Sequence, residues 1–130
     1  MTDDAPQNAV LVADDEAQLL ALCGRVLRRR GYEVLTARDG DEAVRAAAAR
    51  RGEVRVVVMD ATISPAGAAP ACGEILRMLG DVALIVTSGG DLEAPVSELL
   101  AAHRGVFLRK PFSPAALVRA VEDAHLHGRD

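Results

Sequence analysis

The chain has 130 residues, of which 50% are hydrophobic and 26% are charged, and it carries a formal net charge of −4. This length indicates a single domain with a sizeable core, no apolar run approaches the ~20 residues of a membrane span, and the acidic balance argues against direct binding of nucleic acid. Two cysteines, Cys23 and Cys72, are too few for a disulfide framework and are predicted to be buried free thiols, while an N-terminus without an apolar signal segment predicts a cytoplasmic protein.

The first half of the chain alternates short apolar runs, typical of buried strands, with helical patterns. Strands are predicted at Ala9–Asp14, Tyr32–Ala37 and Val54–Asp60. A helix between the first two strands is indicated by apolar residues at helical spacing, namely Leu19, Cys23, Val26 and Leu27. Gly31 is the predicted C-cap of this helix, and the alanine-rich segment Asp41–Arg51 predicts a second helix.

The second half of the chain repeats this alternation after a loop of unusual composition, Ala61–Ala69. Pro70 is compatible with the first turn of a helix and leads into a predicted helix at Glu74–Leu79. The remaining predicted elements are a strand at Val82–Val86, a helix at Glu93–Ala102, a strand at Val106–Lys110 and a last helix that begins at Ser113 and Pro114.

Five strand–helix repeats joined by short links predict an α/β fold, a three-layer, doubly wound sheet of five parallel strands with helices on both faces. Right-handed crossovers make the strand order 2-1-3-4-5 of flavodoxin-like folds a natural outcome. The domain is expected to span residues 8–126, with solvated tails at residues 1–7 and 127–130.

Charged or hydroxyl side chains stand at the carboxyl ends of four of the five predicted strands. Asp14 and Asp15 end the first strand, and Asp60 ends the third. Thr87 follows the fourth strand, and Lys110 ends the fifth. In open α/β sheets, ligands bind in the crevice outside the carboxyl ends of the strands. These five side chains are therefore predicted to form one site.

Each of these residues also has an ordinary structural interpretation. Asp15 and Gln18 have the spacing of a helix capping box. Asp60 alone is compatible with a loop residue that ends a strand, and Lys110 alone with a solvated lysine. The recurrence of such residues at one edge of the sheet favours a common site over separate coincidences.

Five stretches of the chain form an ordered set: Val10–Glu16, Gly31–Ala37, Val57–Asp60, Ile85–Gly89 and Phe107–Phe112. This set resembles the receiver domain of bacterial two-component response regulators, and the resemblance covers nearly the whole chain. The ordered combination is specific, whereas the acid pair or the Lys-Pro-Phe sequence alone is not. The resemblance implies a phosphoacceptor module that is not an enzyme for an external substrate and catalyses only its own phosphorylation and dephosphorylation.

Residue by residue, the resemblance implies that Asp60 is the phosphoacceptor and that Mg²⁺ is the cofactor. Asp14, Asp15 and Asp60 would hold the metal together with the backbone carbonyl of Thr62, with Asp14 acting through a water molecule. Mg²⁺ suits this set because it takes hard oxygen ligands and bridges carboxylates to phosphate. Lys110 would neutralise a phosphoryl oxygen, since phosphoryl transfer is catalysed mostly by positioning and charge neutralisation.

A hydroxyl and an aromatic residue are implied to form the switch of the family. Thr87 would donate to a phosphoryl oxygen by moving toward it, and Phe107 would turn into the space that the hydroxyl leaves. Ser88 is a rival for the hydroxyl role, and a permanently buried core aromatic is the alternative for Phe107. The family also implies a cis peptide bond between Lys110 and Pro111, which would aim the lysine into the crevice.

The loop after Asp60 departs from the pattern of the family. Where the family usually has a proline, four residues after the phosphoacceptor, the chain has Ser64. Pro65 comes one residue later, and Gly67 has no aspartate before it. The path of this loop and the start of the helix that follows it are therefore left open, while the acid cluster is not affected.

The resemblance implies partners on both sides of a signalling step. A sensor histidine kinase or a histidine phosphotransfer protein would supply the phosphoryl group. A downstream protein effector would bind the face formed by the fourth helix, the fifth strand and the last helix. No nucleic acid or membrane partner is expected, and the chain is expected to be a monomer or a weak homodimer.

Two other functions are compatible with the predicted fold. One is an interaction adaptor, or pseudo-receiver, that works without phosphate, and the irregular loop after Asp60 is its only support. The other is a small flavin-binding electron carrier, which needs a phosphate-cradling loop after the first strand. The anionic segment Asp14-Asp15-Glu16 occupies that position and disfavours the carrier.

Overall fold

The computed structural model of the chain describes residues 8–127, and of His127 it describes only the backbone. The predicted tail residues 1–7 and 128–130 lie outside the described part, and His127, predicted as a tail residue, is the last residue of a helix. None of the helices in the described part is both long and apolar enough to pass through a lipid bilayer.

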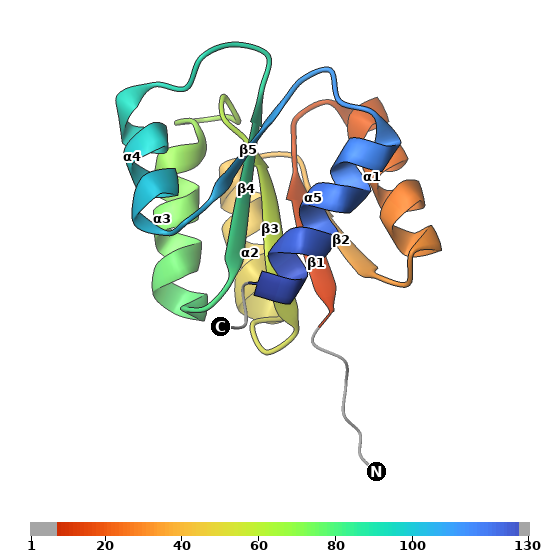
Figure 1. Cartoon of the computed structure of the whole chain (residues 1–130). Helices are drawn as coiled ribbons and strands as arrows, with labels where there is room; N and C mark the ends of the chain where they lie inside the picture. The colour runs from red at the N-terminus through yellow and green to blue at the C-terminus, as the bar shows by residue number, and fades with distance from the viewer. Residues whose placement is uncertain (1–7, 128–130) are drawn as a thin grey trace.

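Five strands alternate with five helices in the described part of the chain (Figure 1). The strands are β1 (Ala9–Ala13), β2 (Glu33–Ala37), β3 (Val54–Asp60), β4 (Ala83–Ser88) and β5 (Val106–Arg109). The helices are α1 (Ala17–Arg29), α2 (Gly40–Ala49), α3 (Ala68–Leu79), α4 (Ala94–Ala102) and α5 (Pro114–His127). Every predicted element is present, and β3 has its predicted bounds.

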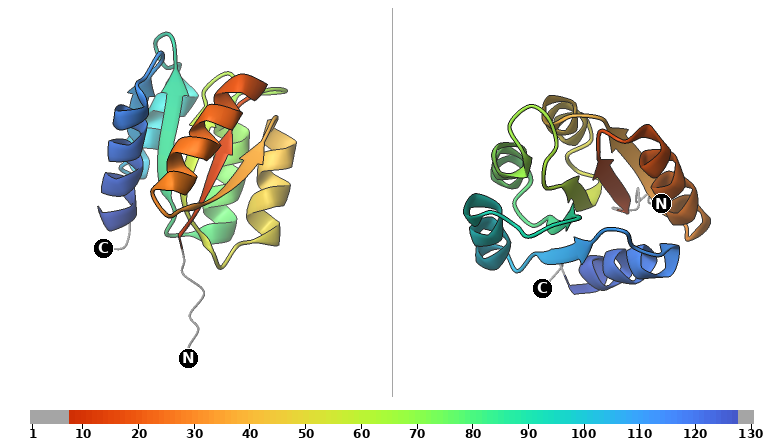
Figure 2. Two further views of the ribbon diagram at one scale, coloured as in Figure 1. Left: turned by 90° about the vertical axis from the view of Figure 1, so that its right-hand side faces the viewer. Right: turned by 90° about the horizontal axis from the view of Figure 1, so that it is seen from above.

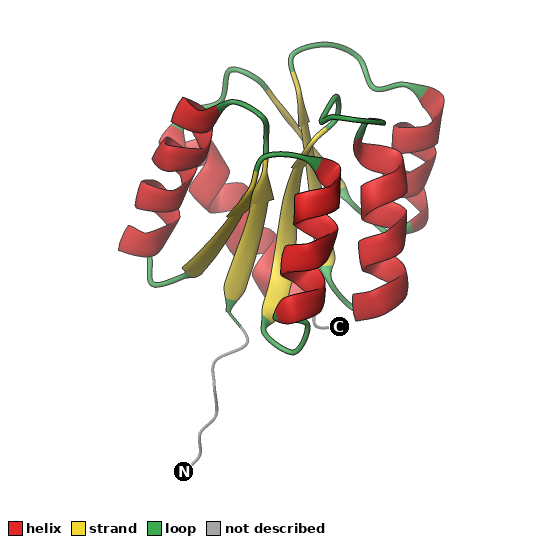
Figure 3. Ribbon diagram, turned by 180° about the vertical axis from the view of Figure 1, so that it is seen from behind, coloured by secondary structure: helices red, strands yellow, loops and turns green. Residues whose placement is uncertain are grey.

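The five strands form one parallel sheet with the order β2-β1-β3-β4-β5, as predicted, so the chain has the flavodoxin-like α/β architecture. Helices α1 and α5 cover one face of the sheet, and α2, α3 and α4 cover the other (Figures 2 and 3). All strands run toward the upper edge of the sheet in Figure 1. The carboxyl ends of β1, β3, β4 and β5 therefore meet at that edge.

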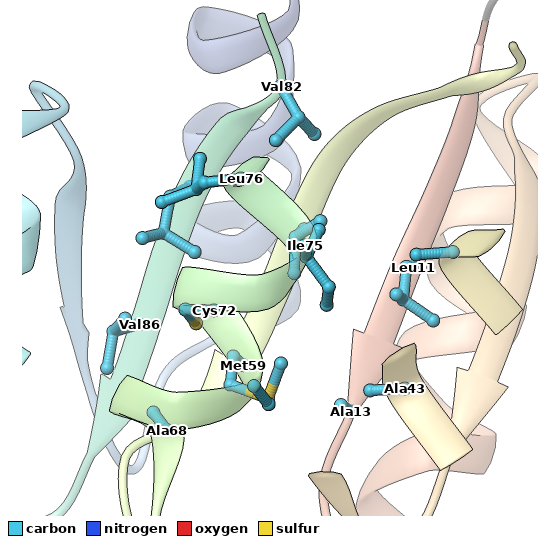
Figure 4. Packing of buried hydrophobic residues seen from close by; sticks show 14 of the residues in the cluster. Leu11, Ala13, Ala43, Met59, Ala68, Cys72, Ile75, Leu76, Val82 and Val86 are labelled. Atoms are coloured by element: carbon cyan, nitrogen blue, oxygen red, sulfur yellow. The ribbon is translucent and has the colours of Figure 1, made fainter. Parts of the chain in front are cut away.

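The alternating side chains of β3 divide the core into two aliphatic layers. Val57 and Met59 pack into the layer toward α2 and α3, and Val56 and Val58 pack into the layer toward α1 and α5. Figure 4 shows the first layer, in which Cys72 of α3 lies close to Met59. A strand covered on both faces needs apolar residues at successive positions, which explains the nearly continuous apolar run of β3.

Strand β4 is longer than predicted because it has paired neighbours on both sides. It continues past Val86 through Thr87 and Ser88. Thr87 pairs in register with Asp60 of β3, and Ser88 pairs with Arg109 of β5. Two polar residues thus lie inside a buried strand, where the apolar run alone predicts that the strand has already ended.

Helix α3 starts at Ala68, earlier than the predicted start at Glu74. Pro70 lies in its first turn, where the N–H that proline lacks has no partner within the helix in any case. The helix therefore begins directly after the loop that departs from the family pattern.

The capping-box interpretation of Asp15 and Gln18 is wrong. Glu16 is the N-cap residue of α1, and no side chain caps this helix. The backbone N–H of Glu16 donates instead to Asp14 Oδ1 at 2.9 Å. The carboxylate of Asp15 is therefore free of a capping role and available to the site.

Cys23 and Cys72 are buried free thiols, as predicted. Burial raises the pKa of Cys72 to about 12, and burial together with the nearby charge of Asp14 raises the pKa of Cys23 to about 11. Because the thiolate is the reactive form, we expect neither thiol of the folded protein to react with Ellman's reagent at about pH 8. Both are expected to react after unfolding in guanidinium chloride. Rapid release of one equivalent of thionitrobenzoate from the folded protein would contradict this expectation.

Candidate functional site

The residues predicted to form the site lie together at the carboxyl edge of the sheet. Asp14 directly follows β1, Asp60 is the last residue of β3, and Lys110 directly follows β5. Thr87 lies near the end of β4 and pairs with Asp60. Four strands that are separate in the sequence thus each contribute a side chain to one place.

Three carboxylates form an acidic cluster at this edge. Asp14, Asp15 and Asp60 each place a carboxylate oxygen within 4.8 Å of those of the other two. Asp14 and Asp60 are almost fully buried, with exposed fractions of 3% and 5%, whereas Asp15 is exposed. The cluster is therefore open to solvent on the side of Asp15, and its oxygens could hold a metal ion.

Lys110 reaches into the acidic cluster from the end of β5. Its Nζ atom donates to Asp14 Oδ2 at 2.7 Å and to Asp60 Oδ1 at 3.3 Å. Burial of the ammonium group lowers the pKa of Lys110, but the hydrogen bonds and charges of Asp14 and Asp60 outweigh this effect, and the net pKa is raised. Lys110 is therefore held in its charged form. Asp15 is left with no ion-pair partner among residues 8–126.

The backbone at the end of β5 holds Lys110 in place. The backbone N–H of Lys110 donates to the carbonyl oxygen of Ser88 at 2.9 Å, which extends the pairing between β5 and β4 by one residue. The peptide bond between Lys110 and Pro111 is cis, as the resemblance implies.

The sheet register distinguishes Thr87 from its rival Ser88. Both residues are buried, with exposed fractions of 2% and 6%. Because Thr87 is the register partner of Asp60, its side chain lies on the same face of the sheet as Asp60, and the side chain of Ser88 points to the opposite face. The Ser88 hydroxyl oxygen also accepts from the backbone N–H of Gly90 at 3.0 Å. The arrangement favours Thr87 for a hydroxyl that acts at Asp60.

Phe107 is only partly buried and packs against the core layer toward α2 and α3. In this conformation the ring is therefore not fully buried. The guanidinium Cζ atom of Arg109 lies over the ring, 5.2 Å from its centroid. The sequence prediction did not include Arg109, although its position two residues after Phe107 on one strand places both side chains on the same face.

Backbone hydrogen bonds determine the path of the loop after Asp60. The N–H of Ile63 donates to the carbonyl of Asp60 at 3.2 Å, and the N–H of Gly67 donates to the carbonyl of Ile63 at 2.7 Å. The N–H of Ala68 donates to the carbonyl of Ala61 at 3.0 Å and so closes the loop at the start of α3. The side chain of Ile63 is fully buried. This loop is thus ordered without the side-chain pattern of the family.

The loop also contacts α2 and the carboxylate of Asp60. The N–H of Gly40, the first residue of α2, donates to the carbonyl of Ser64 at 2.7 Å, and the Ser64–Pro65 peptide bond is cis. The hydroxyl of Thr62 donates to Asp60 Oδ2 at 3.3 Å. The sequence prediction assigned only the carbonyl of Thr62 to the site, although a hydroxyl two residues after an acid is the signal for this contact.

Gly67 is required by the backbone of this loop. Its φ of +81° and ψ of −176° lie in a region that is essentially restricted to glycine, and a Cβ atom would lie 3.3 Å from the carbonyl oxygen of Ala61. We expect Gly67→Ala to lower the free energy of unfolding by about 1–3 kcal/mol, measured by urea denaturation.

Gly73→Ala is the matched control for this substitution. Gly73 lies inside α3, and a Cβ atom there would contact nothing within 4 Å. Alanine is favoured over glycine inside a helix, so this variant is expected to be more stable than the parent by about 0.5–1 kcal/mol. Equal effects of the two substitutions would show that the loop backbone does not depend on Gly67.

The comparison with protein families identifies the chain. The sequence model of the response regulator receiver domain matches residues 10–122. The chain belongs to this family. Receiver domains act in two-component signalling with histidine kinases and downstream effectors, and they typically bind Mg²⁺ at an acidic site like the cluster described above.

Two relatives show how much of this receiver domain is shared. The chain is 31% identical to the chemotaxis protein CheY of Thermotoga maritima over 113 residues. This alignment covers 86% of the chain and 92% of CheY. The chain is 33% identical to the transcriptional regulatory protein GlrR of Escherichia coli K12 over 118 residues. This alignment covers 88% of the chain and 26% of GlrR. The chain thus spans about a quarter of the length of that regulator.

Solved structures of receiver domains have the same fold. A response regulator receiver domain protein from Clostridium thermocellum superposes with a TM-score of 0.80 at 27% identity, over 94% of the chain and 97% of that protein. The receiver domain of the hybrid histidine kinase CckA superposes with a TM-score of 0.78 at 26% identity, over 90% of the chain and 98% of that domain.

Proposed function

We propose that this receiver domain is a phosphoacceptor module of a two-component or phosphorelay system and takes a phosphoryl group onto Asp60. The placement of the Asp60 carboxylate supports this most. Its Oδ1 lies 3.3 Å from Lys110 Nζ, and one of its oxygens lies within 4.8 Å of one carboxylate oxygen of Asp14 and of Asp15. A nucleophilic oxygen, an acidic pair and a fixed cation are the parts that phosphoryl transfer requires.

In the proposed reaction, a carboxylate oxygen of Asp60 attacks the phosphorus of a phosphohistidine on a kinase or a phosphotransfer protein. The new O–P bond forms as the P–N bond breaks. The histidine nitrogen keeps the electron pair of that bond and takes up a proton. Catalysis by the chain is limited to this transfer and to the later hydrolysis of its own aspartyl phosphate.

The donor set of the cluster fits a divalent cation. Three carboxylates come together with only one lysine, so the four groups carry a formal charge of −2. We assign the cation as Mg²⁺, which prefers hard oxygen ligands and, when bound, supplies positive charge between the acids and the phosphoryl oxygens. Asp15, Asp60 and the backbone carbonyl of Thr62 would hold it. Asp14 would act through a water molecule, since its Oδ2 already accepts from Lys110 at 2.7 Å.

Lys110 has a separate role in this proposal. Its raised pKa keeps it charged at neutral pH, and its Nζ atom already lies between Asp14 and Asp60. An incoming phosphoryl group brings about two negative charges to the cluster. Lys110 would bind one phosphoryl oxygen and offset part of this charge.

The proposed output is a change of conformation at Thr87 and Phe107. The hydroxyl of Thr87 would move toward a phosphoryl oxygen on Asp60, and the loop after β4 would follow it. Phe107, which is partly exposed in the present structure, would turn into the space that Thr87 leaves. The face of α4, β5 and α5 would then differ between the two states and be recognised by a downstream protein.

The proposal places the receiver domain in the cytoplasm, as a monomer or weak homodimer that meets a histidine kinase or phosphotransfer protein. The interaction adaptor without phosphate remains the competing function. The sequence feature that supported the adaptor was the irregular loop after Asp60. This loop does not disrupt the site, because Lys110 still contacts the acidic cluster.

Incubation with acetyl phosphate tests the proposed function. In the presence of Mg²⁺, we expect the intact mass of the protein to increase by one phosphoryl group, and we expect EDTA to prevent the increase. Beryllofluoride with Mg²⁺ is expected to raise the temperature of thermal unfolding, because it binds only the folded site. If the protein responds to neither reagent, the phosphoacceptor function is wrong and the adaptor is favoured.

A further inference from the structure

Arg109 connects two parts of the receiver domain that lie outside the acidic cluster. Its guanidinium lies over the ring of Phe107, with 5.2 Å between Cζ and the ring centroid. The same guanidinium donates to the carbonyl of Gly89 at 3.5 Å and lies 3.7 Å from a carboxylate oxygen of Asp91. One side chain thus contacts the partly buried aromatic of β5 and the loop between β4 and α4.

Strand geometry explains why these contacts occur together. Phe107 and Arg109 are two residues apart on β5, so their side chains leave the same face of the strand. Arg109 is also the register partner of Ser88, the last residue of β4. The hydroxyl of Ser88 accepts from the N–H of Gly90, so the loop leaves β4 beside Arg109.

We propose that Arg109 is a positioning residue that holds the Phe107 ring and the β4–α4 loop in their present arrangement and thereby opposes phosphorylation of Asp60. The coupling to phosphorylation rests on the proposed function, in which the loop and the ring both move. A shift of the loop separates Gly89 and Asp91 from the guanidinium, and a turn of the ring separates Phe107 from it. Contacts made in only one of two states shift the equilibrium between them by their own free energy.

The chemistry of arginine suits this role. Its planar guanidinium can stack on an aromatic ring and donate hydrogen bonds in its plane at the same time, which a shorter, uncharged glutamine cannot do. A cation over an aromatic ring at an exposed site changes an equilibrium constant about two- to fivefold. The ion pair with Asp91 adds little, because Asp91 is fully exposed and 56% of the Arg109 side chain is exposed.

The free protein offers a direct test of the contact, because the chain has only two phenylalanines. Protein labelled with 4-fluorophenylalanine is therefore expected to give two ¹⁹F resonances, and Phe112→Leu assigns the one from Phe107. We expect Arg109→Gln to move the Phe107 resonance toward its position in wild-type protein with beryllofluoride and Mg²⁺. Arg45→Gln removes the same charge from an exposed position on α2 and is expected to leave the resonance in place.

The affinity for beryllofluoride in excess Mg²⁺ tests the coupling to the site. We expect Arg109→Gln to bind it about two- to fivefold more tightly than wild type, and Arg45→Gln to bind it equally well. A Phe107 resonance that does not move in Arg109→Gln overturns the contact. If the Phe107 resonance moves in Arg109→Gln but the affinity for beryllofluoride does not rise, Arg109 contacts the ring but does not oppose phosphorylation.

The two proposals fail in different ways. If wild-type protein binds no beryllofluoride and takes no phosphoryl group, the proposed function is wrong. The proposed coupling of Arg109 to phosphorylation is then wrong as well. If wild-type protein is phosphorylated but Arg109→Gln has wild-type affinity, the phosphoacceptor function stands and the role of Arg109 is wrong.

Discussion

Asp60→Asn is expected to reduce phosphorylation by acetyl phosphate to background. Asparagine has the size of aspartate, but its amide is not a nucleophile toward phosphorus. The variant is expected to fold, because Lys110 keeps its shorter hydrogen bond, to Asp14 at 2.7 Å. Intact mass spectrometry after incubation with acetyl phosphate and Mg²⁺ measures the effect. Borohydride reduction of the wild-type protein, which converts an aspartyl phosphate to homoserine, identifies the modified residue.

Asp81→Asn is the matched control. Asp81 is exposed and precedes β4, at the end of the sheet opposite the cluster, so its replacement removes one carboxylate without touching the site. This control is expected to be phosphorylated like wild type. Persistent labelling of Asp60→Asn, or homoserine at a position other than 60, would show that Asp60 is not the phosphoacceptor.

Lys110→Met is expected to destabilise the metal-free protein by about 3 kcal/mol. Methionine keeps much of the length of lysine but leaves the buried carboxylates of Asp14 and Asp60 without their cation. Removing one partner of a buried ion pair typically costs about 3–5 kcal/mol, and the lower end applies here because 22% of the Lys110 side chain is exposed. The free energy of unfolding in urea, in the presence of EDTA, measures the loss. The control variant Arg45→Met, at an exposed position on α2, is expected to change the free energy of unfolding by less than about 0.5 kcal/mol.

The pH and Mg²⁺ dependence of this loss distinguishes charge from packing. The pKa of Lys110 is raised in the folded protein above its ordinary value of 10.5. The contribution of Lys110 to the free energy of unfolding is therefore complete below pH 10.5 and is lost as the pH rises through the raised pKa. The difference between wild type and Lys110→Met is therefore expected to be constant from about pH 7 to 9 and to narrow only at higher pH. Mg²⁺ is expected to stabilise the variant more than wild type. A loss of stability that changes neither with alkaline pH nor with Mg²⁺ would indicate a packing defect.

The fold was predictable because its strands are buried in a way that leaves a clear pattern. β1 is buried at all five positions and β3 at six of seven, so both are nearly continuous apolar runs that end in an acid. Short links between strands and helices then restrict the topology to right-handed crossovers. The positions of Asp14, Asp60 and Lys110 at one edge follow from that topology, and the structure places them in contact.

The ends of the elements were less predictable because they depend on neighbours that are distant in the sequence. β4 continues through Thr87 and Ser88 only because β3 and β5 pair with them. A sequence pattern contains the residue types at these positions but not the partners that decide which conformation they adopt.

By itself, the sequence determined the family of this protein, the order of its sheet and the residues that meet at its carboxyl edge. These follow from the periodicity of apolar residues and from strand ends that a parallel sheet must bring together. Only the tertiary structure decided that Lys110 lies closer to Asp14 than to Asp60, that backbone hydrogen bonds order the loop after Asp60, and that Arg109 contacts both Phe107 and the β4–α4 loop. The contacts of Lys110 and the contact of Arg109 with the β4–α4 loop depend on how segments far apart in the chain pack in three dimensions. The hydrogen bonds within the loop depend on its local backbone conformation. The periodicity of residues along the chain specifies neither.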